Sequence, residues 1–111
     1  YVMDIDFEKL LQDMLSAAKV VLDKHWKEAR PFAEQQFKSF NENIQMIADM
    51  KLRGEITEEK ARLHLNIQKN SMQIVLLTIE GLGILAVEAA INAAIDVIKG
   101  TVNTALGWTI L

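Results

Sequence analysis

The side chains of this sequence that are able to bind a metal ion or transfer protons are two histidines and fifteen acidic residues. A di-iron or di-manganese helical bundle uses Glu-x-x-His pairs that project from neighbouring helices into the interior. No glutamate here has a histidine three residues later, and neither His25 nor His64 has an acid four residues away. The spacing therefore predicts no metal site.

Nucleophilic catalysis lacks its usual sequence signals as well. The chain has no cysteine, and Ser16, Ser39 and Ser71 have neither a nearby histidine nor the glycine-flanked nucleophile elbow. Gly81-Leu82-Gly83 lacks both the rest of a dinucleotide fingerprint and the strand that would precede it. We predict a protein without catalytic residues or a cofactor, and therefore not an enzyme.

The charge pattern bears on partners and location. The net charge is -3, and basic residues alternate with acidic ones, as in Lys24, Lys27, Glu28 and Arg30. Binding to a phosphate backbone needs a basic face, so we predict no nucleic-acid partner. Residues 1–9 are acidic and lack the basic start of a signal peptide, which predicts a cytoplasmic location.

The helical elements follow from the spacing of apolar residues. Between Phe7 and Ile47 they recur at steps of three and four, the helical period. Gly54 suits the left-handed residue that closes a helix, and Thr57 is able to cap the next one. We predict a single all-α domain with a helix over about 4–53, a turn at 54–56, a helix over about 57–99 and a C-terminal tail at 100–111.

Three positions weaken these two long helices. Pro31 removes a backbone donor and clashes one turn back, but residues 28–30 contain no Gly, Asn or Ser that would reverse the chain. We therefore predict a kink at Pro31 within one long helix, with a true break as the alternative. Gly81 and Gly83 raise the same choice in the second half. The tail after Gly100 either frays or docks through Trp108.

Residues 74–98 are the most apolar stretch, although they include Glu80, Glu88, Asn92 and Asp96. A membrane span wants ~20 apolar residues with few charges, and a surface helix has a broad polar face. This stretch fits neither, so we predict a helix that is buried on most sides. Because a lone antiparallel hairpin has no interior, we expect it to assemble into a four-helix-type bundle as a homodimer or larger homo-oligomer.

The oligomer interface is expected on the apolar and small residues of this stretch, since small side chains let helices approach closely. The predicted interface residues are Ile74, Leu77, Leu82, Leu85, Ala86, Ala89, Ala90, Ala93, Ala94 and Val97. Glu88, Asn92 and Asp96 recur at helical spacing and predict a solvent edge on the same helix. The polar stretch at 41–43 is predicted to be a solvated face.

These features predict a non-enzymatic structural or interaction protein that associates with itself, or with another helical protein, through its second helix. Two alternatives stay open. One is a membrane-active protein that inserts residues 74–98, especially at low pH, where the acids of this stretch lose their charge. The other is a carrier of lipid or another apolar ligand. Each charged residue costs ~2.5–3.5 kcal/mol near the bilayer centre, which favours the soluble bundle.

Overall fold

The computed structural model describes residues 5–111, which form four α-helices and one short 3₁₀ helix. Helix α1 (Phe7–Leu22) leads through the 3₁₀ helix η1 (Asp23–His25) into α2 (Trp26–Leu52), and α3 (Glu58–Leu76) and α4 (Ile84–Leu106) follow. The predicted all-α class is confirmed. The predicted start of the first helix at residue 4 lies outside the described residues.

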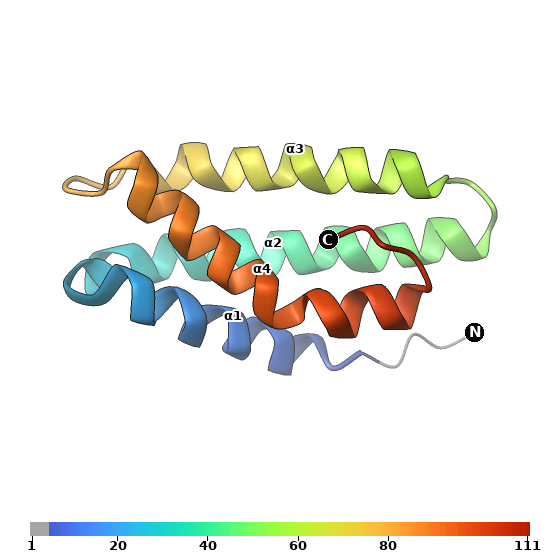
Figure 1. Ribbon diagram of the computed structural model, residues 1–111, viewed down its shortest axis with the longest axis horizontal. Coiled ribbons are helices and arrows are strands. Elements are labelled where there is room, and N and C mark those ends of the chain that lie inside the picture. The colour runs from blue at the N-terminus through green and yellow to red at the C-terminus, as the bar shows by residue number, and fades with distance from the viewer. Residues whose placement is uncertain (1–4) are drawn as a thin grey trace.

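The helices close into a ring around one core. Helices α1, α2 and α3 run side by side, and α4 crosses them obliquely, as Figure 1 shows. Helix α1 packs on α2, α2 on α3, α3 on α4 and α4 back on α1. The resulting body measures 43 × 23 × 18 Å. Each helix contributes fully buried side chains, among them Met14, Phe37, Met72 and Ile91.

The first predicted helix is broken at Asp23 and not kinked at Pro31. Helix α1 ends at Leu22, and Asp23 takes a φ of 46° with a ψ of -110°, which lies outside the left-handed helical region. Leu22 and Ala29 are buried on either side of the break, so packing holds both flanking helices in place. Pro31 lies exposed within α2. The prediction of one helix over 4–53 is therefore wrong.

The turn between α2 and α3 has the chemistry that the sequence predicts. Gly54 takes a φ of 70°, and the Glu55 backbone N–H donates to the Met50 carbonyl at 2.8 Å, which closes the end of α2. The Thr57 hydroxyl oxygen accepts a hydrogen bond from the Lys60 backbone N–H at 3.2 Å and so caps α3. Local side chains decide this turn, and its prediction is confirmed.

The second predicted helix is also divided. Helix α3 ends at Leu76, and α4 begins only at Ile84, after a turn in which Gly81 has a φ of 89°. Glycines 81 and 83 therefore mark a break between two helices, so the prediction of one helix over 57–99 is wrong. The second of these helices also runs past the predicted stop.

Helix α4 passes Gly100 and ends at Leu106, so the predicted tail at 100–111 begins too early. Val102 and Leu106 are buried, and this burial outweighs the ~1 kcal/mol that a glycine costs inside a helix. After the helix, Trp108 docks on the chain itself, with the Lys51 ammonium 4.7 Å from the centre of its ring. Lys51 also donates a hydrogen bond to the Leu106 carbonyl.

The breaks at Asp23 and at Gly81 divide the two predicted helices into four. One chain therefore contains the four helices that the prediction assigned to two copies. Val87, Ile91 and Ile98 of α4 are fully buried in the common core. The expectation that residues 74–98 need a second copy to be covered is therefore wrong for the core side of α4. Asn92 and Asp96 are exposed, which confirms the predicted solvent edge at these two positions.

Candidate functional site

The ten predicted interface residues do not lie on one surface. Leu82, Ala90 and Ala94 are buried in the core, and Ala86 and Ala93 are partly buried. The exposed ones divide between two places. Ile74 and Leu77 lie at the end of α3, whereas Leu85, Ala89 and Val97 lie on α4. The structure therefore separates a core set from an exposed set that includes the last turn of α3.

Helix α3 has two apolar faces on opposite sides. One face packs into the core through Ala61, Leu65, Met72 and Leu76. The other faces solvent and carries Leu63, Ile67, Ile74 and Leu77, whose exposed fractions are 60%, 55%, 67% and 37%. A surface helix of a globular protein normally has a polar outward face. The other helices also expose apolar residues, such as Leu85 of α4, but on α3 four of them follow one face, and this alignment needs a functional explanation.

The outward residues follow a regular spacing. With Asn70 they recur at steps of four, three, four and three, from residue 63 to residue 77. At 3.6 residues per turn they fall within an arc of roughly 80°, and the core face is centred on the opposite side of the helix. This alternation is the seam pattern by which one helix packs along another. We call Leu63, Ile67, Asn70, Ile74 and Leu77 the outer stripe.

Polar contacts hold α3 in place on either side of the outer stripe. The His64 Nε2 and Asn43 Oδ1 atoms lie 3.0 Å apart and join α3 to α2. Arg62 donates from Nε and from one terminal nitrogen to the Thr109 carbonyl, at 3.2 and 3.1 Å, and that nitrogen also pairs with Glu58 at 3.0 Å. The outer stripe is therefore presented on a helix whose first half is fixed to two other parts of the chain.

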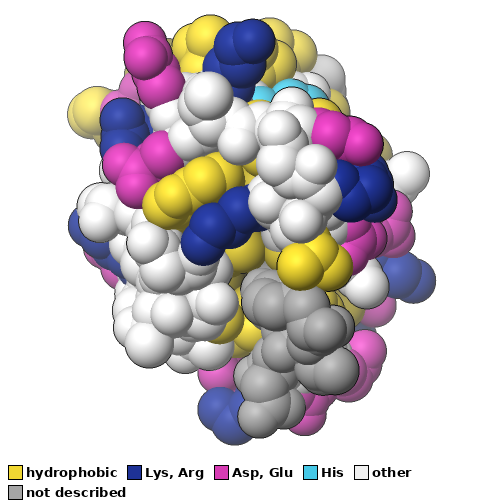
Figure 2. Space-filling view, turned by 90° about the vertical axis from the view of Figure 1, so that its right-hand side faces the viewer, with side chains coloured by type: hydrophobic (Ala, Val, Ile, Leu, Met, Phe, Trp, Pro, Cys, Tyr) yellow, Lys and Arg dark blue, Asp and Glu magenta, His cyan; other side chains and the backbone are white. Residues whose placement is uncertain are grey.

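The end of the molecule that carries the α2–α3 turn shows how charge is distributed. In Figure 2, acidic and basic side chains alternate around this end, and hydrophobic side chains emerge at the top, on the α3 side. Such a mixed surface gives a phosphate backbone no continuous basic face. Exposed apolar side chains are the feature of this surface that a protein partner would use.

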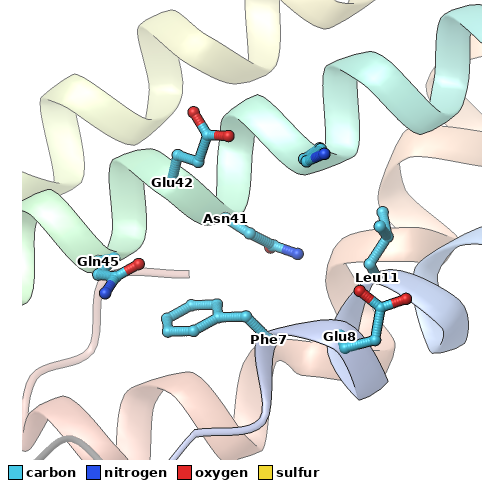
Figure 3. Close-up of a pocket in the computed structure, with 7 residues that line it drawn as sticks. Phe7, Glu8, Leu11, Asn41, Glu42 and Gln45 are labelled. Atoms are coloured by element: carbon cyan, nitrogen blue, oxygen red, sulfur yellow. The ribbon is translucent and has the colours of Figure 1, made fainter.

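A second candidate lies between α1 and α2. Asn41 is only 4% exposed, and neither atom of its amide has a hydrogen-bond partner among residues 5–111. The prediction that residues 41–43 form a solvated face is therefore wrong at Asn41, because α1 covers this side of α2. In Figure 3 the Asn41 side chain extends from α2 toward α1.

A pocket of about 150 Å³ adjoins this buried amide. Its lining residues are Phe7, Glu8, Leu11, Lys38, Asn41, Glu42 and Gln45. Phe7 and Leu11 of α1 give it an apolar wall, and the charged side chains come from both helices (Figure 3). The polar groups of this lining are carboxylates, amides and the Lys38 ammonium.

No group of three or more His, Asp or Glu side chains within residues 5–111 is placed to hold a metal ion. Across the same part of the chain, none of the helices has the length and hydropathy to span a membrane. Residues 74–98 are divided among the end of α3, the turn at Gly81 and the first part of α4.

Comparisons with protein-family models, with curated proteins and with solved structures find no match to this chain. Sequence reasoning missed the outer stripe, although its four-three alternation is visible in the residues from Leu63 to Leu77. Because residues 74–98 are the most apolar stretch, the interface was predicted there and not along the earlier part of α3.

Proposed function

We propose that the protein is a non-enzymatic helical interaction protein that associates with itself through the outer stripe of α3. The observation that supports this proposal is that α3 is apolar on both sides, with its core face already covered by the chain itself. Clusters of exposed apolar side chains of this kind mark protein interaction sites. The proposed interface therefore lies on α3, whereas most of the interface residues predicted from the sequence lie on α4. Ile74 and Leu77 belong to both the predicted interface and the outer stripe.

The strength of the association follows from what is already buried. Because the core is complete within one chain, folding does not depend on a partner. Burial of the remaining exposed area of Leu63, Ile67 and Ile74, at ~25 cal/mol per Å², stabilises the complex by on the order of 1–2 kcal/mol per side chain. Association itself costs on the order of 4–15 kcal/mol. We therefore propose a weak and reversible oligomer.

The test is the solution mass of the protein across a dilution series, measured by light scattering during gel filtration without detergent. We expect the mass of the wild type to rise with concentration and that of the double variant Ile67→Glu/Ile74→Glu to stay at one chain. Val20→Glu is the matched control, because Val20 is 81% exposed on α1, away from the outer stripe. It should associate as the wild type does.

Two outcomes would contradict the proposal. One is a wild type that stays monomeric at every concentration. The other is a double variant that associates as strongly as the wild type. Circular dichroism of the variant should match that of the wild type, since both substituted side chains are exposed. A variant that loses its helical signal would contradict the assignment of Ile67 and Ile74 to an outward face.

A second candidate function is the binding of a small ligand in the pocket beside Asn41. The supporting observation is the buried amide without a hydrogen-bond partner within residues 5–111, next to a cavity of about 150 Å³. The pocket opens to solvent, and Phe7 and Leu11 line it together with five polar or charged side chains, so it suits a small molecule with both apolar and polar parts. For the predicted carrier function this favours a small ligand with an amide-like group, which reaches the Asn41 amide once that side chain turns toward the pocket.

A screen of small aromatic amides by thermal shift tests this second function. A ligand that binds the pocket should raise the melting temperature of the wild type and not that of Asn41→Leu, in which the amide is absent. Equal shifts for the two proteins would contradict binding at this site. Membrane insertion of residues 74–98 stays an alternative, and its test is sedimentation with liposomes as the pH is lowered.

A further inference from the structure

We infer that two copies of the chain pack α3 against α3 in antiparallel orientation, with Asn70 of each copy at the twofold axis. This inference rests on the proposed self-association and adds the orientation and register of the two helices. A closed twofold dimer uses the same surface on both copies, so the surface must be complementary to itself. The outer stripe meets this condition along its whole length.

The first argument is the order of residues around Asn70. Leu63 and Leu77 lie seven residues before and after it, and Ile67 and Ile74 lie three before and four after. When two such helices run in opposite directions about Asn70, Leu63 of one copy meets Leu77 of the other. Ile67 of one copy and Ile74 of the other are offset by one residue, about 1.5 Å along the helix, which still leaves their side chains in reach of each other. Every large apolar residue of the outer stripe then faces another apolar residue.

The second argument is charge, which distinguishes the antiparallel from the parallel arrangement. Lys60, in the first turn of α3 beside the exposed Glu59, lies ten residues before Asn70, and Glu80, in the turn that follows α3, lies ten residues after it; Lys60 and Glu80 are both exposed. An antiparallel pair places Lys60 of one copy at the end where the other copy has Glu80, and it does so twice. A parallel pair places Lys60 beside Lys60 and Glu80 beside Glu80. Helix dipoles also favour opposite directions.

The third argument is the exposed Asn70 in the middle of an otherwise apolar stripe. An asparagine amide has both donors and an acceptor, so two of them at a twofold axis are able to bond each other. Any shift in register would place Asn70 against leucine or isoleucine and leave its amide without a partner. In parallel coiled coils one polar residue at a seam position selects the register, and we apply the same principle to the antiparallel pair.

The size of this contact agrees with a weak dimer. Helix α3 has 19 residues and is on the order of 28 Å long at 1.5 Å per residue. One helix pair of this length belongs to the smallest class of specific interfaces, below about 1,200 Å² in total. The expected dissociation constant is therefore in the range of about 1 μM to 1 mM.

Single cysteines test the orientation directly, because the chain has no cysteine of its own. A disulfide needs Cα atoms about 4.4–6.8 Å apart, so it reports which residues face each other. Leu63→Cys and Leu77→Cys are oxidised separately and as an equal mixture, with one of them carrying a tag that changes its size. We expect the mixed disulfide to exceed either homodimeric product by at least about tenfold, since only the mixture pairs the residues that face each other.

Asn70→Cys and Val20→Cys complete the design. Asn70→Cys should form a disulfide dimer by itself, because residue 70 meets its own copy at the axis. Val20→Cys measures random collision at an exposed position of α1 and should give little dimer. Abundant homodimers of Leu63→Cys and of Leu77→Cys, without excess of the mixed product, would show a parallel pair. That result would overturn this inference and leave the proposed self-association standing.

Failure of the proposed function itself has a different signature. It would appear as crosslinking of Asn70→Cys and of the Leu63→Cys/Leu77→Cys mixture no greater than that of Val20→Cys. A second variant, Asn70→Asp, tests the axis without oxidation. Two carboxylates at the axis repel each other, so the dissociation constant should rise at least about tenfold. An unchanged constant would contradict the placement of Asn70 at the axis.

Discussion

Helices α2 and α3 lie side by side, and each has one face in the core, but their outward faces differ. Helix α2 presents Glu28, Gln35, Glu42 and Asp49 to solvent at steps of seven residues, and its exposed apolar residues on this side, Phe32 and Met46, lie fourteen residues apart. Helix α3 presents leucine and isoleucine at the corresponding spacing. Both helices lie in the same fold, so the fold does not require the apolar outward face of α3. This difference is the main reason to assign an interaction to α3.

The two helices also depart from the usual pattern in opposite directions. Helix α2 places a polar residue, Asn41, in the core, whereas α3 places apolar residues on the surface. A buried amide without a partner costs stability, and an exposed apolar stripe costs solubility. The buried Asn41 amide therefore suggests ligand binding in the adjoining pocket. The exposed apolar side chains of α3 suggest an interaction through the outer stripe.

The largest expected effect comes from placing a charge on each face of α3. Met72→Asp puts a carboxylate into the core and should lower the free energy of unfolding by about 4 kcal/mol or more. Ile74→Asp, two residues further on, should change it by less than about 0.5 kcal/mol. Urea unfolding followed by circular dichroism measures both. Similar losses in the two variants would refute the two-faced description of α3.

A smaller effect is expected at the buried amide of α2. Asn41→Leu removes an amide that has no partner within residues 5–111 and adds apolar volume, so the free energy of unfolding should rise by about 1–2 kcal/mol. Asn43→Leu is the matched control. Asn43 donates to the Ser39 carbonyl at 2.9 Å and contacts His64, so its loss should destabilise the fold. Urea midpoints that move in the same direction for both variants would contradict this reading.

The smallest expected effect concerns the turn that joins α2 to α3. Gly54 has a φ of 70° in open space, so Gly54→Ala should cost about 1 kcal/mol through backbone strain alone. Gly100 lies inside α4, also in open space, and Gly100→Ala should stabilise the protein by about 0.5–1 kcal/mol. The difference between the two melting temperatures gives the measurement. No difference would mean that the turn does not require a left-handed residue.

The sequence was sufficient where local side chains decide the structure. The turn at Gly54 and Thr57 depends on one left-handed residue and one capping hydroxyl, and both are visible in the sequence. The break at Asp23 is different, because nothing local requires an aspartate to take a positive φ. Burial of Leu22 and Ala29 in helices that pack on each other supplies the reason. The continuation of α4 through Gly100 likewise depends on core contacts.

The candidate site was predictable only in part. Ile74 and Leu77 belong to both the predicted interface and the outer stripe, whereas Leu82, Ala90 and Ala94 are covered by the chain itself. A stretch of high hydropathy indicates burial but does not say whether the same chain or a second copy supplies the cover. The spacing of Leu63 and Ile67 carried the missing information, because it continues the same stripe toward the start of α3.

Methyl NMR of isoleucine-labelled protein across a dilution series tests the central claim most directly. The account predicts that the methyl signals of Ile67 and Ile74 shift as the concentration rises, while those of the buried Ile44 and Ile91 stay in place. Backbone amide signals of Gln35 and Glu42, on the outward face of α2, should also stay unchanged. Concentration-dependent shifts on α2, or on neither helix, would contradict the assignment of the outward face of α3 as the interface.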